Sequence, residues 1–405
     1  MPSRQAAATG THVVRRMNVA AVLSALREGD SSATVSSLAS ATGLSRPAVT
    51  RALGELRDRG LVELTAASAS SQPGRPAQYA RFRAESGHVA GIDIGSHKVL
   101  VMIADLAGKV LTVHRAAAPA GVTGPELFDI VRSALTAAVA EAGVRLSGLW
   151  AVSVGVPGVV DRDRGEVLLA PSIPGWAGLP AVSLLRAWLH CPVSIDNDVN
   201  LAVAGERWRG APADAGSDSL VFVHWGRRIG TGIILNGMTH RGSSAAAGEL
   251  GFIDLASGPD APPGPRHADG IGPFERLVGA AAIHRLAREA GAPAGDEEDI
   301  SPLFDAAAAG DPAAVEVVER VAARFARGLA ALVLILDPGR VVIGGGVSRA
   351  GDVLLEPVRR HLRGHALVPV TVHASVLGEQ AVALGAVRHA LDAAEERLPV
   401  PGGET

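Results

Sequence analysis

The sequence predicts an α/β protein in three parts: a winged helix-turn-helix over residues 1–86, a first α/β lobe over residues 87–205 and a second α/β lobe over residues 206–405. Three observations predict it. The first fifth of the chain is basic and the remainder is acidic, strands separated by glycine turns begin near His88, and one strand–turn–strand design occurs twice after that point. A chain of 405 residues also exceeds what one hydrophobic core usually organises.

Composition narrows the class of protein. The single cysteine, Cys191, excludes an internal disulfide and a cysteine-rich metal cage, and it fits a reducing cytoplasm. No basic-then-apolar leader opens the chain, and the longest apolar run, Gly328 to Pro338, is too short to span a bilayer. We therefore expect a soluble cytoplasmic protein with no membrane contact.

Charge is distributed unevenly along the chain. Residues 1–83 hold 11 arginines, no lysine and 5 acidic residues, a net charge of +6. The rest holds 27 basic and 36 acidic residues, a net charge of −9. Such asymmetry is typical of a nucleic-acid-binding head on a body that binds something else.

The basic head has the spacing of a helix-turn-helix. Apolar residues at helical spacing begin at Val19, and after a polar break two further helices are predicted, joined at Gly43. Ser45 is the expected N-cap of the second of these, with Pro47 tolerated in its first turn. An apolar stripe beginning at Val49 leaves a polar face for the major groove of DNA. The expected DNA contacts on this helix are Ser45, Arg46, Thr50 and Arg51.

A wing is predicted after Gly60, where the chain reads as strand, loop tip and strand. The tip holds Gly74, Arg75 and Pro76, and arginine on an extended glycine–proline backbone fits a narrow minor groove, where negative potential is concentrated. Taken singly, a three-helix pattern indicates an ordinary helical subdomain and this triplet an ordinary turn. Combined with the positive charge, they predict that the head binds double-stranded operator DNA.

The acidic body contains two copies of one hairpin. In the first copy a strand from His88 meets a glycine turn at Gly95, and in the second copy the matching glycine is Gly226. Long helices are expected near Glu126–Ala142 and Ala313–Leu336, so helices and strands alternate after each hairpin. We therefore expect two α/β lobes and a ligand crevice facing the strand ends, where glycine turns present backbone N–H groups to phosphate.

Six motifs carry a resemblance to a known family. In chain order they are GIDIGSHK, GVPGVVDRDRG, PSIPGWAGL, IDNDVNLAVAGE, AAGELGF and VVIGGGVSRAG, and they resemble the ROK family of sugar kinases and transcriptional repressors over nearly the whole chain. The head places the resemblance with the repressor branch, of the xylose- and N-acetylglucosamine-repressor type. The resemblance implies an actin-like sugar-kinase fold of two ribonuclease H-like lobes, a C-terminal helix returning to the first lobe, and assembly as a homodimer or homotetramer.

The resemblance also implies an effector site. Asp198 matches the general base of the kinases, where a carboxylate accepts the proton of a sugar hydroxyl during phosphoryl transfer. Without ATP it would only hold the hydroxyl, so no catalytic residue is expected. Short polar groups suit a polyol, whose hydroxyls need donors and acceptors, and for each of them a surface salt bridge or helix cap is the alternative. The implied ligand-binding residues are Gly158, Asn197, Asp198, Glu249 and Glu275.

Both nucleotide loops differ from those that the resemblance implies for a kinase. Ser96 and His97 replace the second glycine and the threonine of the kinase sequence Asp-Ile-Gly-Gly-Thr. In the second loop Arg227 and Arg228 replace a threonine and a glycine, and their bulk fills space that a triphosphate needs. ATP should fit poorly, and no cofactor is expected. The two arginines would either bind a phosphorylated effector through bidentate contacts or pair with acidic neighbours and solvent.

The structural zinc site of the family is not expected either. Phe252 stands at the histidine position, and Arg266, Ala268 and Pro273 stand at the cysteine positions, so all four nitrogen and thiolate ligands are replaced. We interpret His267 as a surface residue. The ring of Phe252 would instead offer an apolar face on which a sugar stacks.

These features predict a DNA-binding regulator, a repressor, of carbohydrate-metabolism genes, with a sugar or sugar-phosphate effector. A symmetric oligomer would bind palindromic operators. Two alternatives stay open. One is an active ATP-dependent sugar kinase with an added DNA-binding head, and the other is a regulator that responds to a protein partner and keeps a vestigial cleft.

Overall fold

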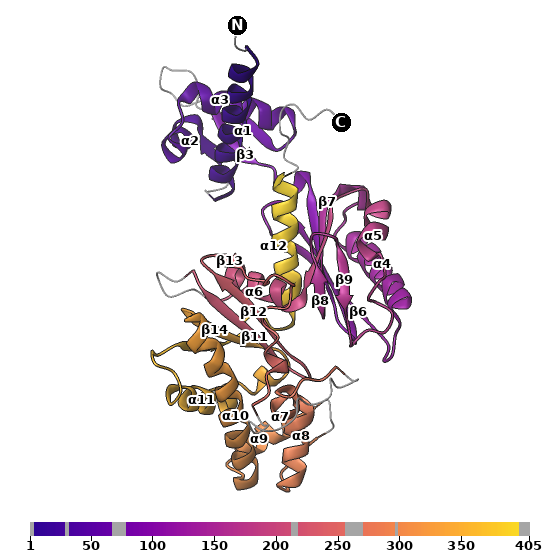
Figure 1. The fold of residues 1–405 in the computed structure, drawn as a ribbon. Helices are drawn as coiled ribbons and strands as arrows, with labels where there is room; N and C mark the ends of the chain where they lie inside the picture. The colour runs from indigo at the N-terminus through magenta and orange to yellow at the C-terminus, as the bar shows by residue number, and fades with distance from the viewer. Residues whose placement is uncertain are drawn as a thin grey trace.

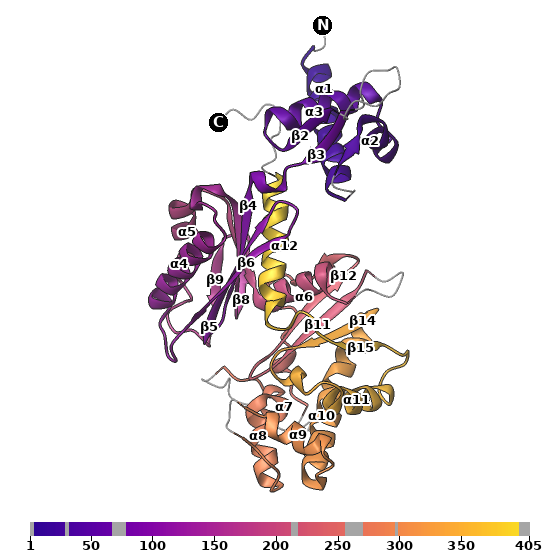
Figure 2. The ribbon, with the colours of Figure 1, turned by 180° about the vertical axis from the view of Figure 1, so that it is seen from behind.

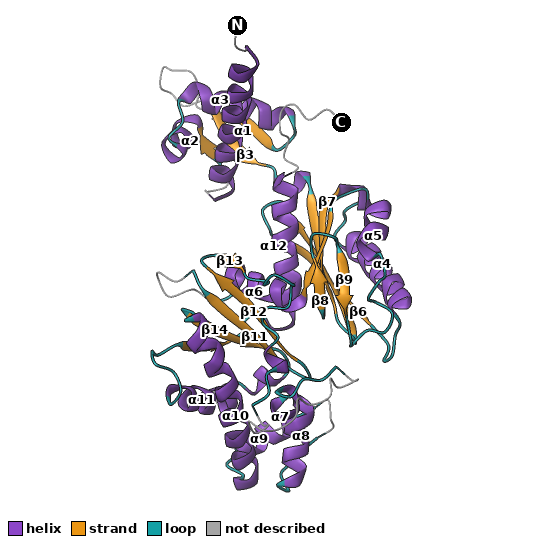
Figure 3. Ribbon diagram, in the orientation of Figure 1, coloured by secondary structure: helices purple, strands orange, loops and turns teal. Residues whose placement is uncertain are grey.

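The computed structural model describes residues 4–28, 32–66, 78–211, 218–255, 270–295 and 299–396. The chain forms a head, a first lobe and a second lobe that follow one another along the molecule, and the C-terminal helix runs beside the first lobe up to the head (Figure 1). Both lobes combine helices with strands (Figure 3), which is the α/β class predicted from the sequence. No helix among the described residues is long and apolar enough to cross a membrane.

The head is the predicted winged helix-turn-helix. Its elements are α1 (Arg4–Glu28), β1 (Ala33–Thr34), α2 (Val35–Thr42), α3 (Arg46–Asp58), β2 (Val62–Ala66) and β3 (Gln78–Phe82). Ser45 is the N-cap of α3, because its hydroxyl accepts the N–H of Ala48 at 3.4 Å. Val49 and Leu53 of α3 are buried in one cluster with Leu23 of α1. The strands form an antiparallel sheet in the order β1-β3-β2.

The first lobe is a five-stranded sheet in the order β10-β7-β4-β5-β6. Helices α4 and α5 pack on one face of the sheet and the C-terminal helix packs on the other. Its elements are η1 (Ala84–Ser86), β4 (His88–Ile94), β5 (Lys98–Asp105), β6 (Val110–Ala117), α4 (Gly124–Glu141), η2 (Leu146–Gly148), β7 (Leu149–Val156), β8 (Val159–Asp161), β9 (Glu166–Leu169), α5 (Ala181–Leu189) and β10 (Val193–Asn197).

The second lobe is a five-stranded sheet in the order β13-β12-β11-β14-β15. Helices α7 to α11 surround the core on one face, and α6 covers the other. Its elements are β11 (Leu220–Trp225), β12 (Ile229–Leu235), β13 (Met238–Thr239), η3 (Leu250–Phe252), α7 (Glu275–Val278), α8 (Ala280–Glu289), α9 (Ser301–Ala308), α10 (Pro312–Leu336), β14 (Arg340–Gly344), η4 (Val347–Ala350), α11 (Asp352–Arg363), β15 (Thr371–Ala374) and η5 (Gly378–Gln380). Two helices link the lobes: α6 (Asp198–Arg209), which begins where β10 of the first lobe ends, and α12 (Ala381–Glu396), which returns to the first lobe.

The two sheets repeat one strand design. β4 pairs antiparallel with β5 and parallel with β7, and β11 pairs antiparallel with β12 and parallel with β14. Gly95 and Gly226 lie in the turns of the two hairpins, as the internal repeat predicts. The two long helices expected from the sequence are α4 and α10.

Helices α6 and α12 lie between the two sheets. α12 packs on β4 and β7, and α6 packs on β11 and β12. The two helix backbones touch: a Cβ added to Gly385 would lie 1.7 Å from the carbonyl oxygen of Leu201, and one on Gly205 would lie 2.3 Å from that of Ala381. Any side chain at these glycines would push the helices apart, so glycine is required for this close backbone contact.

The far end of α12 packs on the head (Figure 2). Leu391 and Ala394 of α12 share a hydrophobic cluster with Leu23 of α1. Arg27 of α1 forms an ion pair with Glu395 of α12. α12 therefore connects the first lobe to the head.

Candidate ligand cleft and nucleic-acid interface

β10 ends at Asn197, whose side chain caps α6. Its Oδ1 accepts the backbone N–H groups of Val199 and Asn200 at 3.0 and 3.2 Å, and its Nδ2 donates to the carbonyl oxygen of Gly158 at 2.7 Å. Gly158 has a φ of 119°, and a Cβ there would lie 1.9 Å from a backbone carbonyl oxygen, so only glycine fits. Asn197 and Gly158 are thus in contact, and together they fix the turn that presents Asp198.

Asp198 stands at the first position of α6, among other carboxylates. Burial raises the pKa of Asp198 to about 7, and the negative charge of Asp93 adds to the shift. Burial also raises the pKa of Asp93 to about 6, opposed by the Lys98 ammonium 3.6 Å away. Glu249 of the second lobe, whose own pKa is raised by burial, contributes to the shift of Asp198. Carboxylates from both lobes therefore meet in one poorly solvated site.

Glu275, at the start of α7, is held by the backbone of the second lobe. Its Oε1 accepts the N–H of Ile229 at 2.8 Å, and its Oε2 accepts the N–H of Gly272 at 2.8 Å. The side chain is only 3% exposed, and its Oε2 lies 3.7 Å from the guanidinium of Arg228. This carboxylate fixes the first residue of β12, and its charge raises the pKa of Glu249 further after burial.

The two arginines of the β11–β12 turn have different surroundings. Arg228 donates to the carbonyl oxygen of Gly270 and faces Glu275. Arg227 is exposed, and with the residues that the structure describes it forms no hydrogen bond or ion pair. Arg228 thus pairs with an acidic neighbour and Arg227 faces solvent, as the second interpretation of these arginines expects. Phosphate binding by Arg227 stays a prediction.

A chain of ion pairs lies beside the turn between β4 and β5. Lys98 Nζ lies 3.6 Å from Asp93 and 3.3 Å from Glu379, and Arg115 lies 2.8 Å from the same Glu379. Beside this chain, burial and then the charge of Lys98 lower the pKa of His224 to about 4, so its imidazole is neutral at pH 7. Sequence reasoning did not select Lys98, although it belongs to the motif GSHK, and it had no signal for Glu379, which lies 281 positions away.

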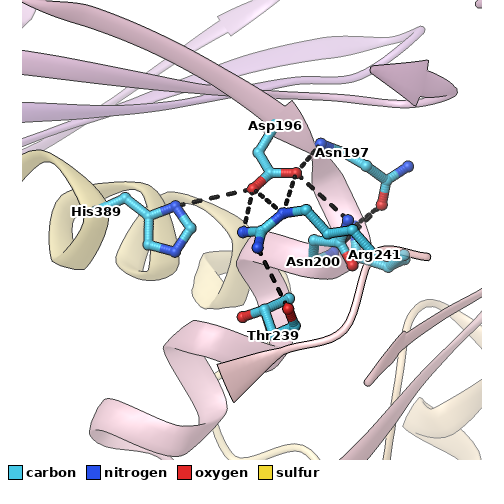
Figure 4. Close-up of polar contacts among 7 residues, drawn as sticks. Asp196, Asn197, Asn200, Thr239, Arg241 and His389 are labelled. Atoms are coloured by element: carbon cyan, nitrogen blue, oxygen red, sulfur yellow. Dashed lines mark hydrogen bonds and ion pairs between the residues drawn. The ribbon is translucent and has the colours of Figure 1, made fainter. Parts of the chain in front are cut away.

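A buried polar cluster beside Asn197 was also missed. Asp196, Arg241 and His389 come together from β10, from the segment after β13 and from α12 (Figure 4). Asp196 lies within the motif IDNDVN, which was the available signal. Arg241 and His389 carry no local signal, because their roles depend on contacts between distant segments.

The positions that would hold zinc do not fit a metal. Phe252 lies in η3 with 53% of its surface exposed, and Pro273 lies just before α7. Neither side chain offers a nitrogen or sulfur ligand. Arg266, His267 and Ala268 lie outside the described residues. Within the described ranges, no group of three or more histidine, cysteine, aspartate or glutamate residues is placed to hold a metal ion.

The exposed face of α3 carries two arginines, Arg46 and Arg51. Arg46, Thr50 and Arg51 are all exposed, and the Thr50 hydroxyl donates to the carbonyl oxygen of Arg46 at 2.9 Å. In the described part of the chain neither Arg46 nor Arg51 has an ion pair, whereas Arg59 binds Glu55 at 2.9 Å. Such solvated, unpaired cations are what a polyanion engages. The predicted wing tip, Gly74, Arg75 and Pro76, lies outside the described residues and stays a prediction.

Comparison with known proteins finds matches to both parts of the chain. The ROK family matches residues 89–393, and the MarR family matches residues 15–70. A glucokinase of Halalkalibacterium halodurans is 30% identical over 311 residues, which cover 73% of this chain and 92% of that protein. An N-acetylglucosamine repressor of Escherichia coli O6:H1 is 28% identical over 376 residues, which cover 90% of this chain and 89% of that protein. The crystal structure of a ROK family transcriptional regulator, a homolog of the E. coli MLC protein, matches with a TM-score of 0.78 at 21% identity and covers 96% of this chain and 100% of that one.

Proposed function

The chain belongs to the ROK family, and from this premise we propose that it is a DNA-binding transcriptional regulator, a repressor, of carbohydrate-metabolism genes. Its effector is a sugar or sugar phosphate that binds in the kinase-like cleft without ATP. One observation carries the proposal: a single chain joins exposed arginines on α3, which have no ion pair among the described residues, to a site where carboxylates of two lobes meet. The similarity of the head to the MarR family supports the DNA-binding half.

The chemistry of the cleft supports a polyol ligand. With a pKa of about 7, Asp198 is partly protonated at neutral pH, so its carboxyl group can both donate and accept a hydrogen bond. Each sugar hydroxyl needs one donor and one acceptor in an enclosed site. In the proposed site Asp198 and Glu249 bind hydroxyls from opposite lobes, while Gly158, Asn197 and Glu275 hold the backbone around them.

The altered loops support binding without ATP. Ser96 and His97 add side chains to the first loop, and the Arg228 guanidinium is bound to the second lobe through Gly270 and Glu275. Lys98, which could meet a phosphate, is instead shared between Asp93 and Glu379. Arg228 and Lys98 are thus engaged in contacts within the protein.

Helix α12 supports a route from the cleft to the operator. A ligand changes DNA affinity only through its different affinity for two arrangements of the body. α6 begins at the proposed sugar-binding turn, contacts α12 at the backbone through Gly205 and Gly385, and α12 ends on the head. Lobe closure on a sugar would therefore turn the head, and in a symmetric dimer it would change the spacing of two heads on a palindromic operator.

The test measures operator binding and sugar binding on the full-length protein. Genomic fragments selected by the protein serve as operator, and fluorescence anisotropy follows their binding at fixed salt, because salt alone changes such affinities strongly. D-glucose, D-xylose, N-acetyl-D-glucosamine and the 6-phosphates of the two hexoses are screened by thermal shift. We expect one of them to raise the melting temperature and to change operator affinity. A sugar that stabilises the protein without changing operator affinity contradicts the regulatory coupling.

A sugar kinase with an added head is the second candidate, and Asp198 favours it. A carboxylate with a pKa near 7 at the start of α6 is suited to accept a hydroxyl proton. ADP release with each sugar, ATP and magnesium decides between the two. The regulator proposal expects no release above that of the Asp198→Asn variant, and turnover that requires Asp198 would replace it with the kinase.

A further inference from the structure

Asp196 of the first lobe and Arg241 of the second lobe are joined by an ion pair (Figure 4). Asp196 lies one residue before the end of β10, and Arg241 lies two residues after β13. The guanidinium binds one carboxylate oxygen twice: Arg241 Nη2 lies 2.6 Å and Nε 3.0 Å from Asp196 Oδ2. The Asp196 side chain is 3% exposed and that of Arg241 is 22% exposed. Two donors of a planar guanidinium on a buried carboxylate leave the pair little freedom to move.

Each partner begins a segment that carries a proposed ligand residue. On the first-lobe side, Asp196 Oδ1 accepts the backbone N–H of the following residue at 2.9 Å, which fixes the turn leading into Asp198. On the second-lobe side, the carbonyl oxygen of Arg241 accepts the N–H of Ala247 at 3.1 Å, which closes the loop leading to Glu249. The ion pair therefore connects the two segments that bring carboxylates to the cleft from opposite lobes.

The third member of the cluster is on the helix that reaches the head. His389 Nδ1 of α12 lies 4.0 Å from Asp196 Oδ2. Burial lowers the pKa of His389, against the charge of Asp196, and the charges of Arg162 and Arg241 lower it further. The imidazole is therefore neutral at pH 7, and the charge of Asp196 is balanced by Arg241. α12 lies against this pair and ends on the head.

We propose that Asp196 and Arg241 are positioning residues for the effector site: their ion pair sets the separation of the Asp198 and Glu249 carboxylates that bind the sugar from the two lobes. This proposal rests on the proposed function for the identity of the ligand. It assigns neither residue a contact with the sugar. They act on the two segments, which they hold in the arrangement that binds the sugar.

A purely structural role would give a different signature. Loss of general stability speeds hydrogen exchange throughout both lobes and leaves sugar affinity unchanged below the melting transition. Loss of positioning speeds exchange locally, in the segments 197–200 and 242–249, and weakens sugar binding. The two roles are thus separated by where exchange increases and by whether affinity falls.

The experiment uses the full-length protein with Asp196→Asn, Arg241→Gln, the double variant and Arg241→Lys. Arg320→Gln is the matched control, because Arg320 makes an exposed ion pair with Glu316 on α10, away from the cleft. Hydrogen–deuterium exchange is measured without sugar, and calorimetry uses D-glucose, D-xylose, N-acetyl-D-glucosamine and the two hexose 6-phosphates. We expect each neutral single variant to speed exchange in both segments and to bind the sugar about tenfold to a hundredfold more weakly, as for the loss of a charged hydrogen bond. Arg241→Lys, which keeps the charge without the fork, should lie between these variants and wild type.

Several results separate this proposal from the proposed function. Unchanged exchange in the two segments overturns the positioning role, whether or not any sugar binds. If the variants exchange faster in the two segments but the wild-type protein binds none of the sugars, the positioning role stands and the sugar-effector proposal is refuted. Equal sugar affinity in wild type and variants overturns positioning while the effector proposal stands. If Arg241→Gln does not fold, Asp196→Asn and Arg241→Lys decide the same questions.

Discussion

The exposed face of α3 and the cleft hold their charges in opposite states. On α3, Arg46 and Arg51 are solvated and have no ion pair among the described residues. In the cleft, burial raises the pKa of Asp198 to about 7, with the charge of Asp93 adding to the shift, and burial raises the pKa of Asp93 to about 6. A surface that meets a polyanion can keep its charges in water and still be ready to bind, whereas a site that encloses a small polyol must remove water from its carboxylates. Burying the carboxylates of the ligand site therefore lowers the stability of the protein, whereas the solvated arginines of α3 do not.

The largest expected effect is the pH dependence that Asp198 gives to stability. Its folded pKa of about 7 lies above the ordinary value of 3.8, so the folded protein holds this proton more tightly than the unfolded chain does. The stabilisation is complete below about pH 4 and is lost as the pH rises to about 7, over a total of at most about 4 kcal/mol. Asp198→Asn should therefore gain stability relative to wild type between pH 4 and pH 8, and lose sugar binding.

Melting temperatures across that pH range measure the effect of Asp198→Asn. Glu316→Gln is the control, because Glu316 is exposed and its ion pair among the described residues is with Arg320 on its own helix. Parallel pH profiles for wild type and Asp198→Asn would show that the cleft carboxylate is as well solvated as the surface one, and the contrast with α3 would disappear.

Glu275 should behave in the opposite way, although it lies in the same cleft. Its two oxygens accept the N–H groups of Ile229 and Gly272, so Glu275→Gln turns an amide NH₂ toward one of these donors. We expect a loss of about 1.5–3 kcal/mol in the free energy of unfolding, the range for hydrogen bonds to charged groups. Urea unfolding at pH 7 measures it, with Glu249→Gln as the control that should not destabilise, because burial raises the pKa of Glu249. Equal destabilisation by the two changes would contradict the proposal that Glu275 holds the backbone while Glu249 binds the ligand.

On α3, a substitution should change DNA binding without changing the stability of the protein. Arg51→Ala should weaken operator binding by about 1–3 kcal/mol and leave the melting temperature of the body unaltered, because the side chain is exposed. Arg57→Ala is the control, since Arg57 is also exposed but pairs with Asp58 at 2.8 Å. An unchanged gel-shift affinity for Arg51→Ala would place the recognition surface elsewhere on the head.

The sequence predicts the head and the cleft to different extents. Local patterns are sufficient for the head: the N-cap at Ser45 and the apolar stripe from Val49 define α3, because cap and stripe depend on neighbours a few positions away. The hairpin glycines Gly95 and Gly226 likewise identify the repeated sheets. These features are requirements of the local backbone, so the residues that meet them can be recognised from their sequence neighbours.

The cleft could be predicted only in part. The motif around Asn197 and Asp198 identifies the turn, but its partners depend on tertiary contacts. Arg241 is 45 positions from Asp196, and no local pattern shows that the two pair. The different surroundings of Arg227 and Arg228 were equally hidden, because adjacent residues in a turn point in different directions and Glu275 reaches only one of them.

The smallest expected effect concerns these two arginines. Arg227 is exposed and has no partner among the described residues, so Arg227→Ala should weaken binding of D-glucose 6-phosphate by at most about 1 kcal/mol, roughly fivefold, and leave D-glucose binding unchanged. The loss should shrink at high salt, as for any solvated ion pair. Arg228→Ala is the matched control: it removes contacts to Gly270 and Glu275, so it should lower the melting temperature and affect both sugars alike. Calorimetry with the two sugars at low and high salt measures the difference. If Arg227→Ala weakens the binding of both sugars equally, Arg227 does not recognise phosphate. Its solvated charge then has no binding role comparable to the one proposed for Arg51 on α3.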